Sequence, residues 1–271
     1  MSTRSGLSRL GWKCVIPILL NNAGTWTELN DRSLKKLNDL QYTLIRYLFN
    51  TPRSCPLPIL NFDVGALKME HRIAKKKLNL AHHIATLDEE SLANEIFEVQ
   101  KELNFPGLIS DCKEIIDSLQ LPDITKKDVS SQWSKVQWNR ETKKKVRAKC
   151  DADLKEKMKG YSKLCDGPMF EEEFGMKDYV KNMKVDDARV NFSLRSKMVP
   201  TKFNYRNDPK YSAELWRCSS CMSGHIESQS HLLYCDAYAD LRADKDINNN
   251  SDLVEYIKNV LTVREKLGIT K

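Results

Sequence analysis

Three cysteines and one histidine in the C-terminal third of the chain carry the clearest chemical pattern in the sequence. Their spacing is Cys218-x2-Cys221-x9-His231-x3-Cys235. A Cys-x2-Cys pair suits a tight turn that directs two thiolates at one ion, and residues four apart share one face of a helical turn. Three sulfurs and one nitrogen complete a closed tetrahedral zinc site that leaves no position for an activated water. We therefore predict that these four residues bind one structural zinc ion.

Two alternatives to this ligand set stay open at the level of the sequence. His225 competes for the fourth position. We prefer His231 because it can share a helix face with Cys235, whereas His225 falls in the intervening loop. The three cysteines could also be unrelated small apolar residues, as free cysteines often are. If zinc binds, its binding energy contributes directly to local folding.

A basic stretch in the middle of the chain is the second chemical feature. Residues 126–163 contain 13 Lys/Arg and five Asp/Glu, a net charge of +8, whereas the whole chain is only +7. Its densest part contains Lys143, Lys144, Lys145 and Arg147. Lys143 and Lys144 precede Arg147 by four and three residues, so a helix would place them on one side, where they could face phosphates. The alternative is an ordinary solvated helix face.

The composition excludes several classes of protein. Of the 271 residues, 41% are hydrophobic and 30% are charged, which argues against a disordered chain and against a membrane protein. The longest apolar run, 15–20, is far shorter than the roughly 20 residues of a spanning helix, and it suits a buried strand or helix start better than a signal peptide. The five remaining cysteines are scattered, which favours a reducing, intracellular compartment.

The elements that position these residues are predicted to be helices. Apolar residues at helical spacing predict a small bundle in the first part of the chain. Its helices cover 30–50, 68–86, 91–104 and 108–120. In the third helix we expect the apolar positions to face the core. These positions are Leu92, Ile96, Val99 and Leu103.

The remaining elements follow from capping patterns and chain breaks. A capping-box pattern at 125–128 predicts the start of a long charged helix that runs to about 164 and carries Trp133 and Trp138, which we interpret as core anchors. A polar linker at 248–251 precedes a final helix capped by Asp252. The predicted fold is therefore mainly α, with a helical bundle, a basic connector, a small finger module and a C-terminal helix. The predicted boundaries place the helical bundle at 1–122, the basic connector at 123–199, the finger module at 200–247 and the C-terminal helix at 248–271.

Six short segments form an ordered set along the chain. They read IPILLNNAGTW at 16–26, RYLFNTPRSCP at 46–56, GALKMEH at 65–71, ARVNFSLRSKM at 188–198, KFNYR at 202–206 and HLLYC at 231–235. The set resembles the C-terminal part of non-LTR (LINE-type) retrotransposon reverse transcriptases. The family patterns are P-x-L-L-Y-G-x-E-x-W, R-x-I-L-G-x-P-x-x-x-P, G-x-x-P-x-E-H, A-R-x-x-F-x-L-R-T-G-M, K-x-N-[FY]-K and E-H-L-L-x-C. In that family a polymerase palm is followed by a helical thumb and connector and then by a Cys-Cys-His-Cys zinc finger.

The chain departs from these patterns at several positions. Asn22, Asn50 and Lys197 stand where the family has glycine, Lys68 replaces a proline, and Ser230 replaces an acid. Asparagine tolerates the left-handed conformation, so the turns at the two asparagines can be kept. Such changes are expected of a diverged or decaying element copy.

The palm aspartates that such polymerases need are not found in the sequence. In the family they hold metal ions for nucleotidyl transfer and lie upstream of the thumb. The chain leaves no room for a palm before residue 12, so we expect no polymerase activity from it alone. Asp186 and Asp187 imitate the catalytic pair, but they follow a Lys-rich helix rather than a strand. We interpret them as a helix N-terminus that the helix dipole favours.

The resemblance implies a nucleic-acid-binding module with RNA or DNA, or both, as partner and with no membrane partner. It also implies a polymerase palm on a separate or missing upstream segment, and nuclear localisation. The residues expected to meet phosphates are Lys143, Lys144, Lys145, Arg147, Arg195, Lys197, Lys202 and Arg206. The alternative is a decayed retroelement remnant, or a zinc-stabilised protein-interaction domain with no nucleic-acid role.

Overall fold

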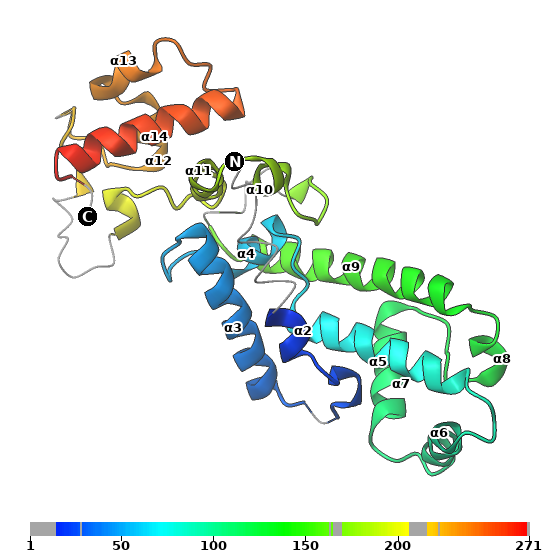
Figure 1. Cartoon of the computed structure of the whole chain (residues 1–271). Coiled ribbons are helices and arrows are strands. Elements are labelled where there is room, and N and C mark those ends of the chain that lie inside the picture. Colours follow the sequence, from blue (N-terminus) through cyan, green and yellow to red (C-terminus); the bar gives the residue numbers. More distant parts are fainter. Residues whose placement is uncertain are drawn as a thin grey trace.

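The predicted mainly α fold is confirmed. The computed structural model describes residues 15–27, 29–162, 164, 170–205, 216–221 and 223–269. Within these ranges the chain forms helices and turns, and the only β-type pairings are isolated bridges between Val64 and Met176 and between Arg217 and Ile226. Figure 1 shows an elongated molecule with a helical bundle at one end and a smaller helical cluster at the other. None of the helices in the described ranges has the length and apolar character that crossing a bilayer requires.

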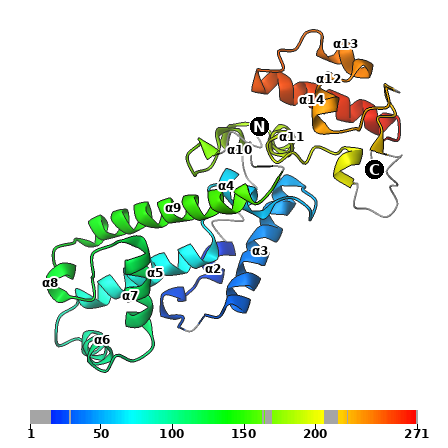
Figure 2. The same cartoon turned by 180° about the vertical axis from the view of Figure 1, so that it is seen from behind.

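The bundle is organised around two long helices, α5 (Met69–Ala85) and α9 (Lys135–Lys159), which lie side by side in both views (Figures 1 and 2). The other elements of this part pack around the pair. They are α2 (Ile16–Leu19), η2 (Ala23–Thr25), α3 (Asp31–Phe49), α4 (Leu57–Asp63), α6 (Leu92–Glu102), α7 (Leu108–Leu119) and α8 (Lys127–Ser130).

The second part of the chain forms shorter elements before one long helix. The first two, α10 and α11, lie between the bundle and the C-terminal cluster (Figure 1). The elements are α10 (Asp178–Asn182), α11 (Val185–Arg195), η4 (Lys202–Tyr205), α12 (Gln229–Tyr234), η6 (Asp236–Tyr238), α13 (Ala239–Arg242) and α14 (Asn250–Lys266). Asp186 and Asp187 lie in the first turn of α11, as predicted.

Helix α9 connects the two hydrophobic cores of the bundle. Every fourth residue from Trp138 to Met158 is buried, which gives the helix one continuous buried stripe. Trp138 and Val146 belong to a core with α5 and α7, whereas Leu154 and Met158 belong to a core with α3, α4 and α11. The indole Nε1 of Trp138 donates a hydrogen bond to the Leu78 carbonyl at 3.1 Å, which confirms Trp138 as a core anchor.

Three helix boundaries follow capping chemistry that the sequence predicted only in part. Asn30, the first residue of the helix predicted over 30–50, caps α3, with Oδ1 accepting a hydrogen bond from the Ser33 amide at 2.9 Å. The predicted start of the long charged helix at 125–128 is wrong, because the reciprocal capping box lies at Ser134 and Gln137 and α9 begins at Lys135. The prediction of Asp252 as the final cap is also wrong, because Asn249 caps α14.

The burial of several side chains differs from the periodicity-based expectation. The predicted inner stripe of α6 faces outwards, and the buried positions of that helix are Asn94 and Phe97. His82 of α5 is buried, with Nε2 3.0 Å from the Trp133 carbonyl and the ring stacked on Trp138. Lys77 of α5 is also buried, and it pairs with Asp111.

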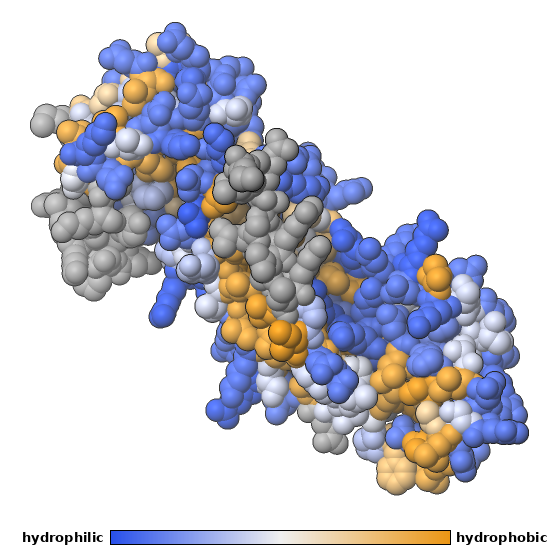
Figure 3. All heavy atoms as spheres, in the orientation of Figure 1, coloured by the Kyte–Doolittle hydropathy of each residue, from blue (hydrophilic) through white to orange (hydrophobic). Residues whose placement is uncertain are grey.

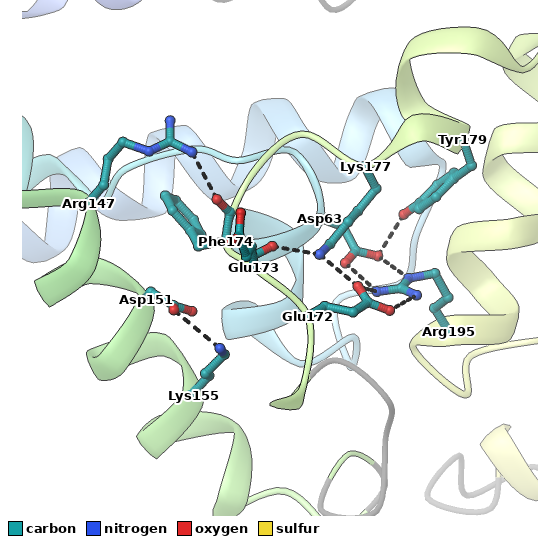
Figure 4. Close-up of polar contacts among 10 residues, drawn as sticks. All are labelled: Asp63, Arg147, Asp151, Lys155, Glu172, Glu173, Phe174, Lys177, Tyr179 and Arg195. Atoms are coloured by element: carbon teal, nitrogen blue, oxygen red, sulfur yellow. Dashed lines mark hydrogen bonds and ion pairs between the residues drawn. The ribbon is translucent and has the colours of Figure 1, made fainter. Parts of the chain in front are cut away.

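A buried ion-pair network joins the bundle to α11 (Figure 4). The side chain of Asp63, in the last turn of α4, is 0% exposed. Its carboxylate accepts two hydrogen bonds from the Arg195 guanidinium, at 2.8 and 3.0 Å, and one from the Tyr179 hydroxyl at 2.7 Å. Glu172 binds the same guanidinium through both oxygens at 2.9 Å. Although burial opposes its charge, these bonds raise the pKa of Arg195 above its ordinary value.

Replacing Arg195 by methionine is expected to destabilise the fold by about 3–5 kcal/mol, because it leaves the buried Asp63 carboxylate without its counter-charge. Lys197→Met removes an exposed charge two residues away and is expected to change the free energy of unfolding by less than about 0.5 kcal/mol. Urea unfolding followed by circular dichroism measures both. Equal stability of the two variants would contradict a structural role for Arg195.

The Glu172 pair makes part of the stability depend on pH. Partial burial opposes ionisation, but hydrogen bonds from Arg195 and Lys177 lower the pKa of Glu172 to about 2. In the unfolded chain a glutamate has a pKa of about 4.3. The contribution of the Glu172 ion pair to the free energy of unfolding is therefore complete above that pH and is lost as the pH falls towards 2. We expect Glu172→Gln to lower the midpoint of urea unfolding at pH 7. The difference in midpoint between this variant and the wild type should become smaller below about pH 4.5. Glu156→Gln, in an exposed pair, should show little gap at any pH.

Candidate metal centre

The two N-terminal cysteines of the predicted site lie on a small backbone hairpin. The bridge between Arg217 and Ile226 closes the hairpin, and the Cys218 amide donates to the His225 carbonyl at 2.8 Å. Gly224 completes the return with φ +76°, a conformation that an L side chain rarely adopts. The hairpin thus holds Cys218 and Cys221 on the same turn, as the Cys-x2-Cys spacing predicts.

The other two residues of the site belong to α12. Ser228 caps this helix, with its hydroxyl accepting a hydrogen bond from the His231 amide at 3.1 Å. Cys235 is the C-cap residue, one turn after His231. The predicted shared helix face therefore exists, and it turns both side chains towards the hairpin.

The four side chains converge on one point. Their ligand atoms all lie within 4.8 Å of one another. Cys218 Sγ and Cys235 Sγ are 3.9 Å apart, and Cys221 Sγ is 3.4 Å from His231 Nε2. A tetrahedral ion with metal–sulfur bonds of about 2.3 Å and metal–nitrogen bonds of about 2.0 Å requires separations of about 3.8 Å and 3.5 Å. The cluster therefore fits one metal ion.

The electrostatic environment differs between the thiols. The Ser223 hydroxyl lies 2.9 Å from Cys221 Sγ and lowers the pKa of this half-buried thiol to about 6. Burial raises the pKa of Cys235 to about 12, and the side chain is only 1% exposed. A bound dication would stabilise the thiolate form at every sulfur, because coordination replaces the proton.

His225 lies beside the cluster rather than in it. Its Nδ1 is 2.9 Å from the Ser223 hydroxyl, and its ring centroid is 5.6 Å from that of His231. The residue is exposed, whereas His231 is half-buried. The geometry therefore brings the preferred histidine, His231, to the three sulfurs and gives His225 a contact with the loop serine.

The metal cluster and the final helix share one hydrophobic core. This core contains Cys218, Leu232, Cys235, Tyr256 and Ile257, together with Leu194 of α11, so it crosses the predicted boundaries at 199/200 and 247/248. The Tyr256 hydroxyl donates to the Leu232 carbonyl at 2.8 Å.

A buried ion pair adds to this packing. Arg264 Nη2 lies 2.7 Å from Glu227 Oε1, and both side chains are at most 1% exposed. Sequence reasoning did not single out this pair, because the two residues are 37 positions apart. The same Glu227 oxygen also accepts a hydrogen bond from the Lys202 amide at 2.9 Å.

Comparisons with known proteins provide no independent assignment. Neither the family models, the curated proteins nor the solved structures gave a match to this chain.

The predicted phosphate-contacting residues of α9 lie on two flanks of the helix. Lys143 and Lys144 are exposed and share a side with Arg147. Arg147 Nη2 donates to the Phe174 carbonyl at 2.8 Å. Lys145 falls on the opposite flank, because successive helical residues rotate by about 100°.

The predicted residues near the finger have different environments. The guanidinium of Arg195 is held by Asp63 and Glu172, and its side chain is 17% exposed. Lys202 Nζ donates to the Arg217 carbonyl at 3.1 Å, which attaches it to the hairpin. Lys197 is exposed, and Arg206 lies outside the described residues.

Sequence reasoning missed one residue of the basic surface. Lys75 of α5 is half-buried, and its pKa is lowered first by burial and then by the positive charge of Lys143 on the neighbouring α9. The two lysines are therefore close enough for their charges to interact across the α5–α9 pair. The spacing along either helix alone gave no signal for this pairing.

Removal of the fourth ligand should distinguish the two histidines. We expect His231→Ala to weaken zinc affinity by more than the roughly 100-fold that loss of an outer hydrogen-bond partner costs, and His225→Ala to retain one zinc per chain. Zinc release to a chromogenic chelator gives the stoichiometry, and the cobalt-substituted protein gives a tetrahedral thiolate absorption band. Equal zinc affinities of the two variants would contradict the Cys3His assignment.

Proposed function

We propose that this chain is a nucleic-acid-binding module that corresponds to the thumb, connector and zinc finger of a non-LTR retrotransposon reverse transcriptase-like protein. In this proposal Cys218, Cys221, His231 and Cys235 hold one structural zinc ion, which stabilises the finger. The soft thiolate donors favour zinc over hard, oxygen-preferring cations. The basic side of the α5–α9 pair, formed by Lys75 of α5 and by Lys143, Lys144 and Arg147 of α9, contacts phosphates.

One observation carries this proposal, namely the backbone conformation at the positions where the family has glycine. Asn22, Asn50 and Lys197 have φ of 54°, 51° and 52°. In the described residues, the only other non-glycine positions with positive φ are Asn104 and Gln120. Left-handed backbone costs glycine almost nothing and costs a lysine more. The backbone at these three positions therefore fits the glycine pattern of the resemblance even where the residue has changed.

The segments that carry the resemblance also meet in space. Phe49 and Phe192, from segments far apart in the sequence, stack with their ring centroids 4.4 Å apart. Arg189 Nε donates to the Leu48 carbonyl at 3.1 Å. Gly65 has φ +63°, and a Cβ there would lie 2.4 Å from the Met176 amide nitrogen, so this matching glycine is required. Contact between the segments supports their interpretation as one ordered set.

The arrangement of charge supports a polyanionic partner. Lys143, Lys144 and Arg147 lie on one side of α9, and Lys75 adds a fourth positive charge from α5. A phosphate placed between Lys75 and Lys143 would relieve the repulsion between their ammonium groups. Such contacts would position a nucleic acid without reading its sequence.

A protein-interaction role without nucleic acid is the second candidate, and an exposed apolar stripe on α6 favours it. The two candidates differ in the salt dependence of binding. Only a phosphate-contacting surface releases counterions, so only the first candidate requires an affinity for nucleic acid that falls steeply with salt.

The test is fluorescence anisotropy of the zinc-loaded chain with a structured RNA and a DNA duplex between about 50 and 200 mM salt. We expect binding with a steep salt slope. Lys75→Glu/Lys143→Glu should weaken binding to all sequences and reduce the slope by about 2, one for each lost phosphate contact.

The control is Lys36→Glu/Lys266→Glu, which reverses the same number of positive charges, both exposed, on other helices. It should leave the slope close to that of wild type. Absence of binding by the folded protein at the lowest salt, or equal losses in both double variants, would overturn the proposal.

A further inference from the structure

Helix α6 has an apolar face that nothing in the described structure covers. Leu92, Ile96, Val99 and Leu103 are 69%, 49%, 46% and 61% exposed. At 100° per residue these positions form a single stripe about three turns long. The opposite face of α6 carries Phe97, which is 2% exposed and packs in the core with α5 and α7. The helix is therefore apolar on both sides, and only one side is used by the bundle.

The stripe belongs to a larger apolar surface at one end of the molecule. Phe105, just beyond the helix, is 58% exposed. Figure 3 shows apolar side chains gathered at the end of the bundle where α6 lies. A contiguous apolar surface of this kind marks an interaction site more often than a solvated helix face, because each exposed side chain carries a hydration cost.

Carboxylates border this stripe along one edge. A groove of about 380 Å³ runs beside Val99 and is lined by Glu89, Glu95, Glu98 and Glu102. Lys127 pairs with Glu89, and Lys101 lies 2.8 Å from Glu98. In the described part of the chain, Glu95 and Glu102 have no ion-pair partner. The edge is thus acidic in a protein whose overall charge is +7.

The chemistry of the stripe and its edge selects the partner. The uncompensated carboxylates would repel nucleic-acid phosphates and anionic lipid headgroups. An amphipathic helix satisfies both features, because its apolar positions can pack along the stripe while lysines or arginines on one flank meet the glutamates.

We propose that the outer face of α6 binds an amphipathic helix of a partner protein whose apolar stripe is flanked by basic residues. This inference does not depend on the proposed nucleic-acid role, since the acidic edge and the basic side of the α5–α9 pair are built from different residues. Each can fail while the other holds.

The test uses three labelled peptides of about 20 residues, a length that allows a helix. The first has leucines at i, i+4, i+7 and i+11 with lysines along one edge, the second has glutamates at that edge, and the third keeps the lysines but scrambles the leucines. Fluorescence anisotropy with the whole zinc-loaded chain should show that the first binds at least about tenfold more tightly than either of the others.

Two variants of the chain separate the apolar contribution to peptide binding from the electrostatic one. Leu92→Ser/Leu103→Ser should weaken the first peptide at least about tenfold, and Glu95→Lys/Glu102→Lys should reverse the preference towards the acidic peptide. Both pairs are exposed, so circular dichroism should show an unchanged fold. The control Val136→Ser/Leu267→Ser removes apolar side chains that are 79% and 64% exposed elsewhere, and it should leave binding unchanged.

Three results would overturn the proposal. These are equal binding of all three peptides, no effect of either α6 variant, and a wild-type dimer in sedimentation analysis that Leu92→Ser/Leu103→Ser converts to monomer. The last result would assign the stripe to a second copy of this chain.

Discussion

The buried carboxylate of Asp63 makes the docking of the second half of the molecule onto the first obligatory. A charge that is 0% exposed is costly unless an opposite charge and hydrogen-bond donors accompany it. Arg195 of α11 and Tyr179 of α10 supply them. Helix α11 in turn packs against α14 and contributes Leu194 to the core that holds the cysteine cluster. The Arg195 guanidinium, together with the stacking of Phe192 on Phe49, therefore fixes the placement of the cysteine cluster relative to the bundle.

The parts of the structure that the sequence could predict are local. The ligands Cys218, Cys221, His231 and Cys235 span only 18 residues, so a turn and a helix bring them together without long-range contacts. The cap at Asn30 and the tolerance of Asn22 and Asn50 for left-handed backbone are also decided within a few residues. At these positions local chemistry and the final fold agree.

What could not be predicted is which side of an element faces the core. Periodicity identifies the residues that share a helix face, but it does not say which face the rest of the chain covers. On α6 a single aromatic residue, Phe97, fills the space against α5 and α7, and the more regular stripe of Leu92 and its neighbours is left outside. His82 became buried because Trp133 and Trp138, more than fifty residues away, offer it a carbonyl and a ring.

The partners of charged side chains were equally hard to predict from the sequence. The sequence does not show whether a lysine or arginine side chain lies in solvent, where it could bind a phosphate, or pairs with a carboxylate far along the chain. Arg195 pairs with Asp63, which is 132 positions away in the sequence, and Arg264 pairs with Glu227, which is 37 positions away. Both arginines are thereby committed to the fold. Lys75 of α5 has a different environment, because burial and then the like charge of Lys143 on α9 lower its pKa. In the proposed function, a lysine that lies beside another cation rather than a carboxylate is the one that stays available for phosphates.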